Sequence, residues 1–448
     1  MAAVAAADKV DDYVNAVMTA QKVPAVVIGI VKDGKLIREQ AYGKVDIELD
    51  VPAATGDAYE IGSMTKQFTA AATLMLVEEG KVGLDDPVAK YVDGCPDSWK
   101  SIKIRNLLNQ TSGLQDYAFV PNLGIVAEFD RSTFMTSMAK LPLDFEPGVT
   151  WAYSNTNYAL LGWVIEKASG KPYPDFVTER IFKPAGMEHT FFGDDTTIRP
   201  RRAHGYMVWQ GNLIRAKVGA GSIASDGSIN STVEDLAKWD AVLRDHKLLK
   251  PESYALLWQP APLNSGRSRP YGMGWFLADP SMPPYVGHGG NSSGYSAGIA
   301  RYTEKGLTVI MLSNLYPVSG EQFCQRIAEI VDPSVKPVLP DAKPDPDAKR
   351  TTKVKEAMLT YAEGKQDASV LEPEVIAPMK TQRAGMNPVW ASVRKLTDFK
   401  FAGAMPKNKD TMLAYRIVTP DRNFTVFILW SDANKIAQMT LKADPPKA

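Results

Sequence analysis

The residues most suited to chemistry in this chain are a serine and a lysine three positions apart. Ser63-Met64-Thr65-Lys66 stands at the start of a segment whose apolar residues recur with helical spacing. Residues three apart lie on one face of a helix, so the hydroxyl and the ammonium group would meet there. A serine hydroxyl attacks substrates only when a neighbouring group takes its proton. We therefore predict that Ser63 is an activated nucleophile.

The same spacing occurs elsewhere, so context must decide between the candidates. Other matches to S-x-x-K are Ser137 with Lys140 and Ser392 with Lys395, and Tyr13-Val14-Asn15 rivals the Tyr153-Ser154-Asn155 motif. Ser63 alone precedes a regular apolar helical pattern, and Tyr153 alone lies between Ser63 and a late glycine-rich run. A serine that only caps a helix is the alternative for any single match.

Lys66 and Tyr153 are the pair available to remove the Ser63 proton. A phenol has a pKa near ~10, so Tyr153 acts as a base at neutral pH only if a cation such as Lys66 stabilises its phenolate. Lys66 would then relay the proton and support the negative charge. The alternative for Tyr153 is a core tyrosine with a satisfied hydroxyl.

A second serine motif, Gly290-Asn291-Ser292-Ser293-Gly294, fits the G-x-S-x-G elbow of α/β-hydrolases. That elbow requires a histidine after the serine, and this chain has none after residue 288. The residues after the motif, 295–302, also have strand character where the elbow requires a helix. We expect Ser292 to be a loop residue.

The elements that would position these groups follow from turn and periodicity signals. Asp33-Gly34 separates two apolar runs, 25–31 and 36–42, which predicts a hairpin, so we expect the fold to open with antiparallel strands. A second hairpin is expected over 298–314. Helices are expected from Ser63 to Gly80 and over the ranges 151–168, 235–243 and 321–330.

The clearest domain boundary is a proline-rich segment. Residues 332–349 contain prolines at 333, 337, 340, 344 and 346 among Asp, Lys and Ala, a composition typical of an extended linker. We predict one unit over 1–331 that holds every candidate catalytic group, and a small α+β unit over 350–448. In the second unit helices come first, near 352–363 and 375–383, and strand-like runs follow near 396–402, 411–418, 423–430 and 436–442.

Composition narrows the classes of partner. The 448 residues are 45% hydrophobic and 23% charged, with 51 basic and 51 acidic residues, so a soluble globular protein with a sizeable core is expected. Without a basic excess we expect no nucleic-acid partner, and a small-molecule or short peptide substrate is favoured. The apolar stretches are too short to predict a membrane span.

Metal and redox chemistry have little support. The four histidines and the cysteines Cys95 and Cys324 show no metal-ligand spacing, so no metal or organic cofactor is expected. Whether the cysteines pair stays open. The start of the sequence is not an intact signal peptide. The location is periplasmic or secreted if a leader was removed, and otherwise cytoplasmic.

Taken together, the ordered motifs resemble the serine β-lactamase and penicillin-binding-protein superfamily, in particular its branch of class C β-lactamases, D-alanyl-D-alanine carboxypeptidases, D-aminopeptidases and family VIII esterases. The resemblance covers roughly residues 10–330. Supporting strings are LLNQTSGL (107–114), FEPGVTWAYSNTNYALLGWVIEKASG (145–170), IFKPAGMEHTFF (181–192), YGMGW (271–275) and GHGGNSSGYSAGI (287–299). The resemblance implies an α+β fold with an antiparallel sheet flanked by helices and a mainly helical subdomain.

The resemblance also implies roles for further residues. Asn155 would hydrogen-bond Lys66 and the acyl side of the substrate. The backbone N–H groups of Ser63 and Asn291 would form the oxyanion hole, and Gly289 and Gly290 would let that backbone approach the substrate. His288 stands where β-lactamases usually have lysine, which makes it a weaker anchor for a carboxylate.

Another departure from the family pattern is Asn109-Gln110, which replaces the usual Ser/Thr-His pair. Its consequence is open at this point. The function expected from residues and resemblance is a serine hydrolase of esterase or peptidase type that cleaves small esters or amides through an acyl-enzyme on Ser63. The alternatives are a D-aminopeptidase, a DD-carboxypeptidase or a weak β-lactamase, and, from another class, a non-catalytic ligand-binding protein. Oligomeric state is not predicted.

Overall fold

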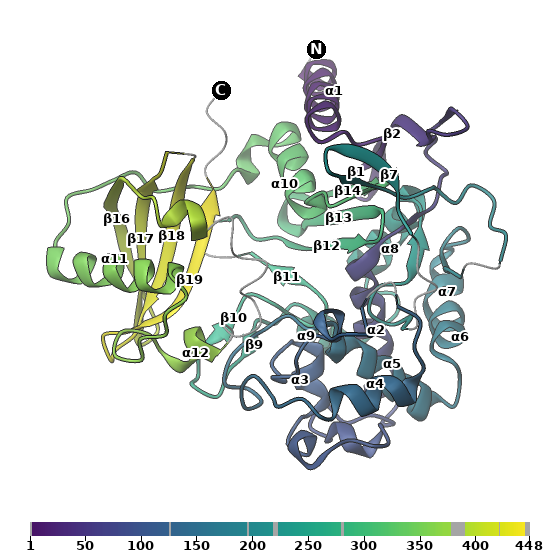
Figure 1. Ribbon diagram of the computed structural model, residues 1–448. Coiled ribbons are helices and arrows are strands. Elements are labelled where there is room, and N and C mark those ends of the chain that lie inside the picture. The colour runs from purple at the N-terminus through teal and green to yellow at the C-terminus, as the bar shows by residue number, and fades with distance from the viewer. Residues whose placement is uncertain are drawn as a thin grey trace.

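A seven-stranded antiparallel sheet forms the centre of the first unit (Figure 1). The computed structural model describes residues 2–124, 127–194, 197–217, 223–278, 282–377, 390–420 and 422–443. The strand order is β11-β12-β13-β14-β1-β2-β3. The strands are β1 (Ala25–Lys32), β2 (Lys35–Asp46), β3 (Val51–Pro52), β11 (Phe276–Leu277), β12 (Val286–Ser292), β13 (Tyr295–Tyr302) and β14 (Leu307–Ser313).

Alternate residues of β1 face two different cores, as the period of two in a strand requires. Val26, Ile28 and Ile30 pack in the core that contains α1 (Ala2–Gln21) and α10 (Gly320–Val331). Val27, between them, belongs to the larger core of the helical region. The sheet is therefore covered on both faces, which explains why almost every residue of β1 is apolar.

Both expected hairpins are confirmed. Asp33 and Gly34 have φ angles of 49° and 79° between β1 and β2, the two positive angles that a tight two-residue hairpin turn requires. β13 and β14 also pair antiparallel, with Tyr302 opposite Leu307 and a four-residue connection that contains the 3-10 turn Thr303–Lys305. The expectation that the fold opens with strands is wrong, because α1 precedes β1 and buries Val10 and Val14 against α10 and the sheet.

The helical region lies on the other face of the sheet and carries most candidate catalytic groups (Figure 1). Expected helices are confirmed as α2 (Thr65–Glu78), α5 (Asn155–Ser169) and α8 (Val233–Arg244), although α5 begins four residues later than expected. The other helices are α3 (Ile104–Leu108), α4 (Arg131–Met138), α6 (Tyr173–Val177), α7 (Lys183–Ala185) and α9 (Pro251–Leu257).

Short strands connect this region to the sheet and to the rest of the chain. Three of them, β4 (Tyr59–Glu60), β5 (Phe191–Phe192) and β8 (Ile229–Ser231), form one small sheet just before Ser63. A second contains β6 (Tyr206–Trp209), β7 (Asn212–Arg215) and β15 (Leu315–Tyr316), and a hairpin pairs β9 (Ala261–Pro262) with β10 (Ser268–Arg269).

The C-terminal part has its own antiparallel sheet and its own hydrophobic core. Its elements are α11 (Ala348–Ala362), α12 (Pro373–Ile376), β16 (Asp398–Lys407), β17 (Asp410–Val418), β18 (Asn423–Trp430) and β19 (Ile436–Ala443). We call this part the C-terminal unit. The helix expected near 375–383 is α12 at its start, and residues 378–383 lie outside the described residues.

The proline-rich segment between the two units has one short 3-10 turn, Pro333–Val335, before α11 begins. The domain boundaries at 331 and 350 stay predictions. Figure 1 shows the sheet of the C-terminal unit beside the first unit, with α12 next to the β9–β10 hairpin.

Candidate active site

Ser63 lies in a single 3-10 turn, η1 (Gly62–Met64), immediately before α2. Gly62 has a φ of +52° there, a conformation that glycine adopts without strain. Lys66, in the first turn of α2, is fully buried, whereas Ser63 is partly exposed. The Lys66 Nζ lies 3.0 Å from Ser63 Oγ, so the spacing places the two groups in contact as predicted.

Lys66 Nζ has three oxygen neighbours in hydrogen-bond range. It donates to Asn155 Oδ1 at 2.8 Å and to the backbone carbonyl of Asp226 at 2.7 Å, and the third neighbour is Ser63 Oγ. The amide oxygen and the carbonyl can only accept. Two Nζ hydrogens are therefore committed to them, and the remaining position of the nitrogen faces the serine hydroxyl, where it can hold a hydrogen or a lone pair.

Asn155 is held in its orientation by a second contact. It is the first residue of α5, and its Nδ2 donates to Asp116 Oδ2 at 3.0 Å while its Oδ1 accepts from Lys66. Asp116 also caps the 3-10 turn at residues 117–119 by accepting from Ala118 N. Burial raises the pKa of Asp116. Asp116 was not among the residues predicted from the sequence. Its position directly after the T-S-G-L-Q string is the sequence feature that could have pointed to it.

A second carboxyl group near Lys66 belongs to Asp226, whose backbone carbonyl accepts from Lys66 Nζ. Its Oδ2 accepts a hydrogen bond from Tyr117 at 2.7 Å, and burial raises its pKa to about 6. Burial lowers the pKa of Lys66 to about 8, although the charges of Asp226 and Asp116 act in the opposite direction. At neutral pH the lysine is thus poised to exchange a proton. No motif in the sequence pointed to Asp226, which lies 160 positions from Lys66.

Tyr153 lies in the extended segment before α5, with its hydroxyl buried beside Ser63. Lys66 Nζ is 5.0 Å from its ring centroid. Among the described residues the hydroxyl has no partner with hydrogen-bond geometry, yet Ser63 is near enough to lower its pKa. Burial dominates and raises the pKa of Tyr153 well above 10. The phenol is therefore held in its protonated form.

Aromatic side chains surround Tyr153. Its ring stacks on Phe276 at 6.3 Å and meets Tyr271 edge-on at 6.4 Å, and Trp151 lies 6.5 Å away. Trp151 and Phe276 are only partly buried. They form an apolar wall at the accessible side of the tyrosine.

His288 lies on β12 beneath this wall and is almost completely buried. Its Nδ1 faces the carbonyl of Gly289 at 2.6 Å, and its Nε2 lies 3.2 Å from the hydroxyl of Tyr271. A carbonyl only accepts, so Nδ1 carries the proton and Nε2 accepts from the tyrosine. Burial lowers the pKa of His288 to about 3. The imidazole is thus neutral over the whole physiological range, and not only near pH 7.

The end of β12 lies directly against the serine turn. A Cβ on Gly290 would come within 1.8 Å of the Ile61 carbonyl oxygen, and a Cβ on Gly62 would come within 2.6 Å of Asn291 N. Gly290 therefore permits a close approach of β12 to the backbone that carries Ser63. Gly289, in contrast, has room for a methyl group beside Glu321. Asn291 itself is exposed, and its Oδ1 accepts from Ser296 Oγ at 2.8 Å.

Gln110 explains why α5 begins late. Its backbone carbonyl accepts from Ala152 N, and its side-chain Oε1 accepts from Ser154 N at 3.0 Å. The same Oε1 accepts from Asn157 Nδ2. These bonds hold the segment that contains Tyr153 in an extended conformation, which answers the open question about this departure from the family pattern.

The remaining candidates fall outside this cluster. Ser292 is the last residue of β12 and not a loop residue, and β13 follows it after a turn, so the strand-turn-helix context of an elbow is missing. Cys95 and Cys324 are both free thiols. Among the described residues, no three His, Cys, Asp or Glu side chains form a group that could hold a metal, and no helix is both long and apolar enough to cross a bilayer.

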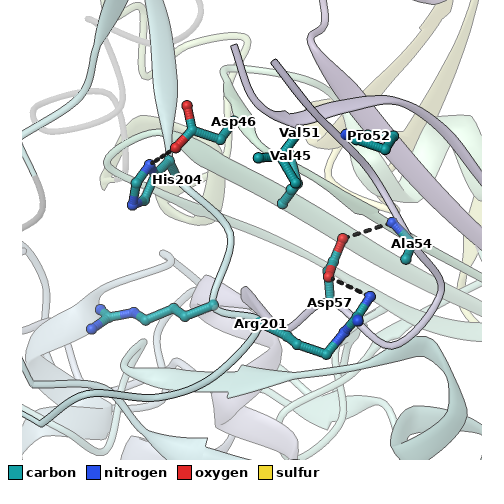
Figure 2. Close-up of a pocket in the computed structure, with 9 residues that line it drawn as sticks. Val45, Asp46, Val51, Pro52, Ala54, Asp57, Arg201 and His204 are labelled. Carbon is teal, nitrogen blue, oxygen red and sulfur yellow. Dashed lines mark hydrogen bonds and ion pairs between the residues drawn. The ribbon is translucent and has the colours of Figure 1, made fainter. Parts of the chain in front are cut away.

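A separate pocket of about 480 Å³ lies between the end of β2, the segment from β3 to Asp57, and residues 201–204 (Figure 2). In it, His204 Nδ1 lies 2.8 Å from Asp46, and Arg201 lies 3.0 Å from Asp57. The described residues that line it are Val45, Asp46, Val51, Pro52, Ala54, Asp57, Arg201, Arg202 and His204. None of the predicted site residues is among them.

Comparison with known proteins completes the description of the site. Residues 10–329 match the family described as Beta-lactamase. The chain belongs to this family. The expected β-lactamase-like α+β fold is confirmed as well, because the structure is similar to solved structures of a penicillin-binding protein homologue and of a D-stereospecific amidohydrolase from Streptomyces sp.. The residues matched include every group in the cluster around Ser63.

Proteins similar in sequence to this chain have different names. A penicillin-binding protein of Bacillus subtilis (strain 168) is 34% identical over 63% of this chain and 66% of its own length. A D-aminopeptidase of Brucella anthropi is 29% identical over 65% of this chain and 56% of its own length. The chain thus spans less than two thirds of the length of these relatives.

A solved structure extends the likeness to the C-terminal unit. The octameric penicillin-binding protein homologue from Pyrococcus abyssi is similar with a TM-score of 0.66 at 22% identity, and the match covers 98% of each chain. At that identity the likeness concerns the fold alone. The fold similarity therefore extends over both the first unit and the C-terminal unit of this chain.

Proposed function

We propose that this chain is a serine hydrolase that cleaves small amide or ester bonds through an acyl-enzyme on Ser63. The observation that carries the proposal is the arrangement at Lys66 Nζ, with two obligatory acceptors on one side and Ser63 Oγ at 3.0 Å on the other. A lysine whose pKa is lowered to about 8 is neutral often enough at physiological pH to act as a base.

In the proposed acylation, neutral Lys66 takes the hydroxyl proton while Ser63 Oγ attacks the substrate carbonyl. The tetrahedral intermediate then collapses, the bond to the amine or alcohol breaks, and the leaving group takes up a proton. Tyr153 is suited to donate that proton, because its phenol stays protonated beside Ser63, and Lys66 can then restore it. Deacylation repeats the sequence with water in place of the serine. This division of roles differs from the phenolate base expected from the sequence.

The developing negative charge requires donors at the carbonyl oxygen. The N–H groups of Ser63 and Asn291 are our candidates, and the close approach of Gly62 to the Asn291 backbone supports them. Asn155, whose amide lies between Lys66 and Asp116, helps to hold Lys66 beside Ser63.

The substrate class follows from the wall beside Tyr153. Trp151 and Phe276 offer apolar surface, and neutral His288 supplies no charge for a substrate carboxylate. We therefore propose uncharged acyl groups as preferred substrates and expect carboxylate-bearing β-lactams to react slowly. Because one relative is named a D-aminopeptidase, amides of D-amino acids are the first peptide-like substrates to test.

Two measurements test the proposal. Ser63→Ala should lower turnover of a neutral p-nitrophenyl ester by roughly 10³-fold or more, and a fluorophosphonate probe should label the peptide that contains Ser63. Labelling at Ser292, or turnover that survives Ser63→Ala, contradicts the assignment. Rates for D- and L-amino-acid amides and one cephalosporin, measured on the same preparation, then separate peptidase, esterase and β-lactamase activity. Absence of turnover on every substrate would favour the non-catalytic alternative.

A further inference from the structure

The two units are joined by ion pairs that exclude solvent. Arg267, in the β9–β10 hairpin, donates to both oxygens of Asp410, from Nε at 2.7 Å and from Nη2 at 3.1 Å. It also contacts Glu374 at 3.1 Å. All three side chains are at most 9% exposed. A buried ion pair of this geometry fixes the two surfaces relative to each other.

Glu374 is the centre of this junction. It belongs to α12, and its second carboxylate oxygen accepts from Arg269 at 3.2 Å. Arg269 is tied to the sheet of the C-terminal unit as well, through Gln438 and the Ala437 carbonyl. Glu374 thus connects both hairpin arginines to the C-terminal unit.

The backbone of Glu374 contacts the segment that leads to Tyr153. Thr150 Oγ1, which is buried, donates to the Glu374 carbonyl at 2.7 Å. Thr150 lies three positions before Tyr153 in a stretch without helix or strand. Gln110, described above, also bonds to this stretch, at Ala152 and Ser154.

The β9–β10 hairpin, which forms ion pairs with Glu374, also contacts the segment that leads to Tyr153. Asn264, at the tip of the β9–β10 hairpin, donates from its backbone N to Gly148 O at 2.8 Å and from Nδ2 to Pro147 O at 3.0 Å. The chain continues from the hairpin to Tyr271 and Phe276, which pack on the ring of Tyr153. Both the start of the Tyr153 segment and its aromatic wall are therefore attached to one residue of the C-terminal unit.

We propose that Glu374 is a positioning residue for Tyr153, and that the C-terminal unit thereby sets the efficiency of the acylation step. This inference rests on the proposed function. Displacement of a proton donor by a fraction of an ångström to 1 Å lowers rates by up to about 10²-fold. The contribution of Glu374 should therefore be visible in acylation and should depend on the presence of the Tyr153 hydroxyl.

The test is a double-mutant cycle in the full-length chain. Glu374→Gln removes the charge that holds both arginines. Glu372→Gln is the matched control, with the same change two positions earlier and no side-chain hydrogen bond or ion pair to the first unit among the described residues. Stopped-flow acylation by a p-nitroanilide, whose amine leaving group must take up a proton, should slow about tenfold in Glu374→Gln and stay near the unmodified rate in Glu372→Gln. In a Tyr153→Phe background the Glu374 effect should disappear.

Other outcomes overturn the inference. If Glu374→Gln lowers the rate by the same factor with and without the Tyr153 hydroxyl, Glu374 acts on stability or on another group. If it behaves like Glu372→Gln, the contact has no catalytic role. Thr150→Val keeps the ion pairs and removes only the hydroxyl bond to Glu374, so it replaces Glu374→Gln should that variant fail to fold. Ser63 labelling with normal turnover in both Glu variants would refute this inference alone, whereas turnover that survives Ser63→Ala would refute the proposed function.

Discussion

At the scale of single residues, the lysine beside the serine determines when the site can work. Lys66 must lose a proton before it can accept one from Ser63, and burial has brought its pKa to about 8. Rates should therefore rise with pH through that value. The carboxylates of Asp226 and Asp116 raise the pKa of Lys66 and so oppose the effect of burial. Substitution of either carboxylate should therefore shift the pKa of Lys66.

Asp226→Asn tests this balance. The carboxylate of Asp226 raises the pKa of Lys66, so its removal should shift the rising limb of kcat/KM for a neutral ester to lower pH. The backbone carbonyl that accepts from Lys66 is kept, and an asparagine oxygen can still accept from Tyr117. Asp245→Asn, on the surface of the first unit, is the control. A limb that stays in place, or moves to higher pH, would show that another group titrates.

His288 gives a prediction about stability. Its pKa is about 3 in the folded chain and near ~6.5 in an unfolded one, so the unfolded state binds more protons between these values. Stability from this residue is present above pH ~6.5 and is lost as the pH falls toward 3, by on the order of 1 kcal/mol per pH unit. Urea unfolding at pH 7.5 and 5.5 should show a smaller acid loss for His288→Gln than for the unmodified chain. An equal loss in both would mean that His288 is protonated in the folded state, and His246→Gln serves as the surface control.

At the scale of elements, the functional contact is that between β12 and the serine turn η1. Nothing in the local sequence of either element indicates that the two will touch. Their close approach depends on the absence of a side chain at Gly290. The site is thus made by a helix start and a strand end that come from opposite ends of the first unit.

Gly290→Ala should disturb this contact. The added methyl group would meet the Ile61 carbonyl at 1.8 Å and must push β12 away from Ser63. We expect a loss of kcat of about 10²-fold or more, the size seen when one oxyanion donor is removed. Gly289→Ala, on the same strand with its nearest contact at 3.6 Å, should cost much less. Equal effects in the two variants would contradict the proposed role of the β12 approach.

At the scale of the whole molecule, buried ion pairs link the C-terminal unit to the first unit. The modular organisation stays a prediction, and the pairs of Arg267 and Arg269 with Glu374 and Asp410 lie between the two parts of the chain. Removal of one partner leaves buried charges without compensation, which is strongly destabilising.

Arg267→Gln in the full-length chain should therefore lower the free energy of unfolding by about 3 kcal/mol, because Asp410 and Glu374 lose a common partner. Arg215→Gln, which breaks an exposed pair with Glu48, should cost less than about 1 kcal/mol. Denaturant titration followed by tryptophan fluorescence measures both. The double variant Arg267→Gln with Asp410→Asn should recover part of the loss. A loss as small as that of Arg215→Gln would mean that the interface pairs are solvated.

The features that the sequence predicted correctly are those set by short-range structure. The spacing of Ser63 and Lys66 fixes their contact through helix geometry, and Asp33-Gly34 fixes a hairpin through its positive φ angles. Family resemblance added Asn155, whose contact with Lys66 the structure contains. These features depend on a few neighbouring residues or on an ordered set of motifs, which a sequence displays directly.

Tertiary structure alone decided the rest, because burial and long-range contacts are properties of packing. The Asp226 carbonyl reaches Lys66 across 160 positions, and Glu374 reaches Thr150 across 224. The protonation states also depend on packing. Burial keeps Tyr153 protonated, lowers the pKa of Lys66 to about 8 and keeps His288 neutral. The sequence by itself therefore predicted which groups are candidates for the reaction, and the packing around them sets the protonation states on which the proposed mechanism depends.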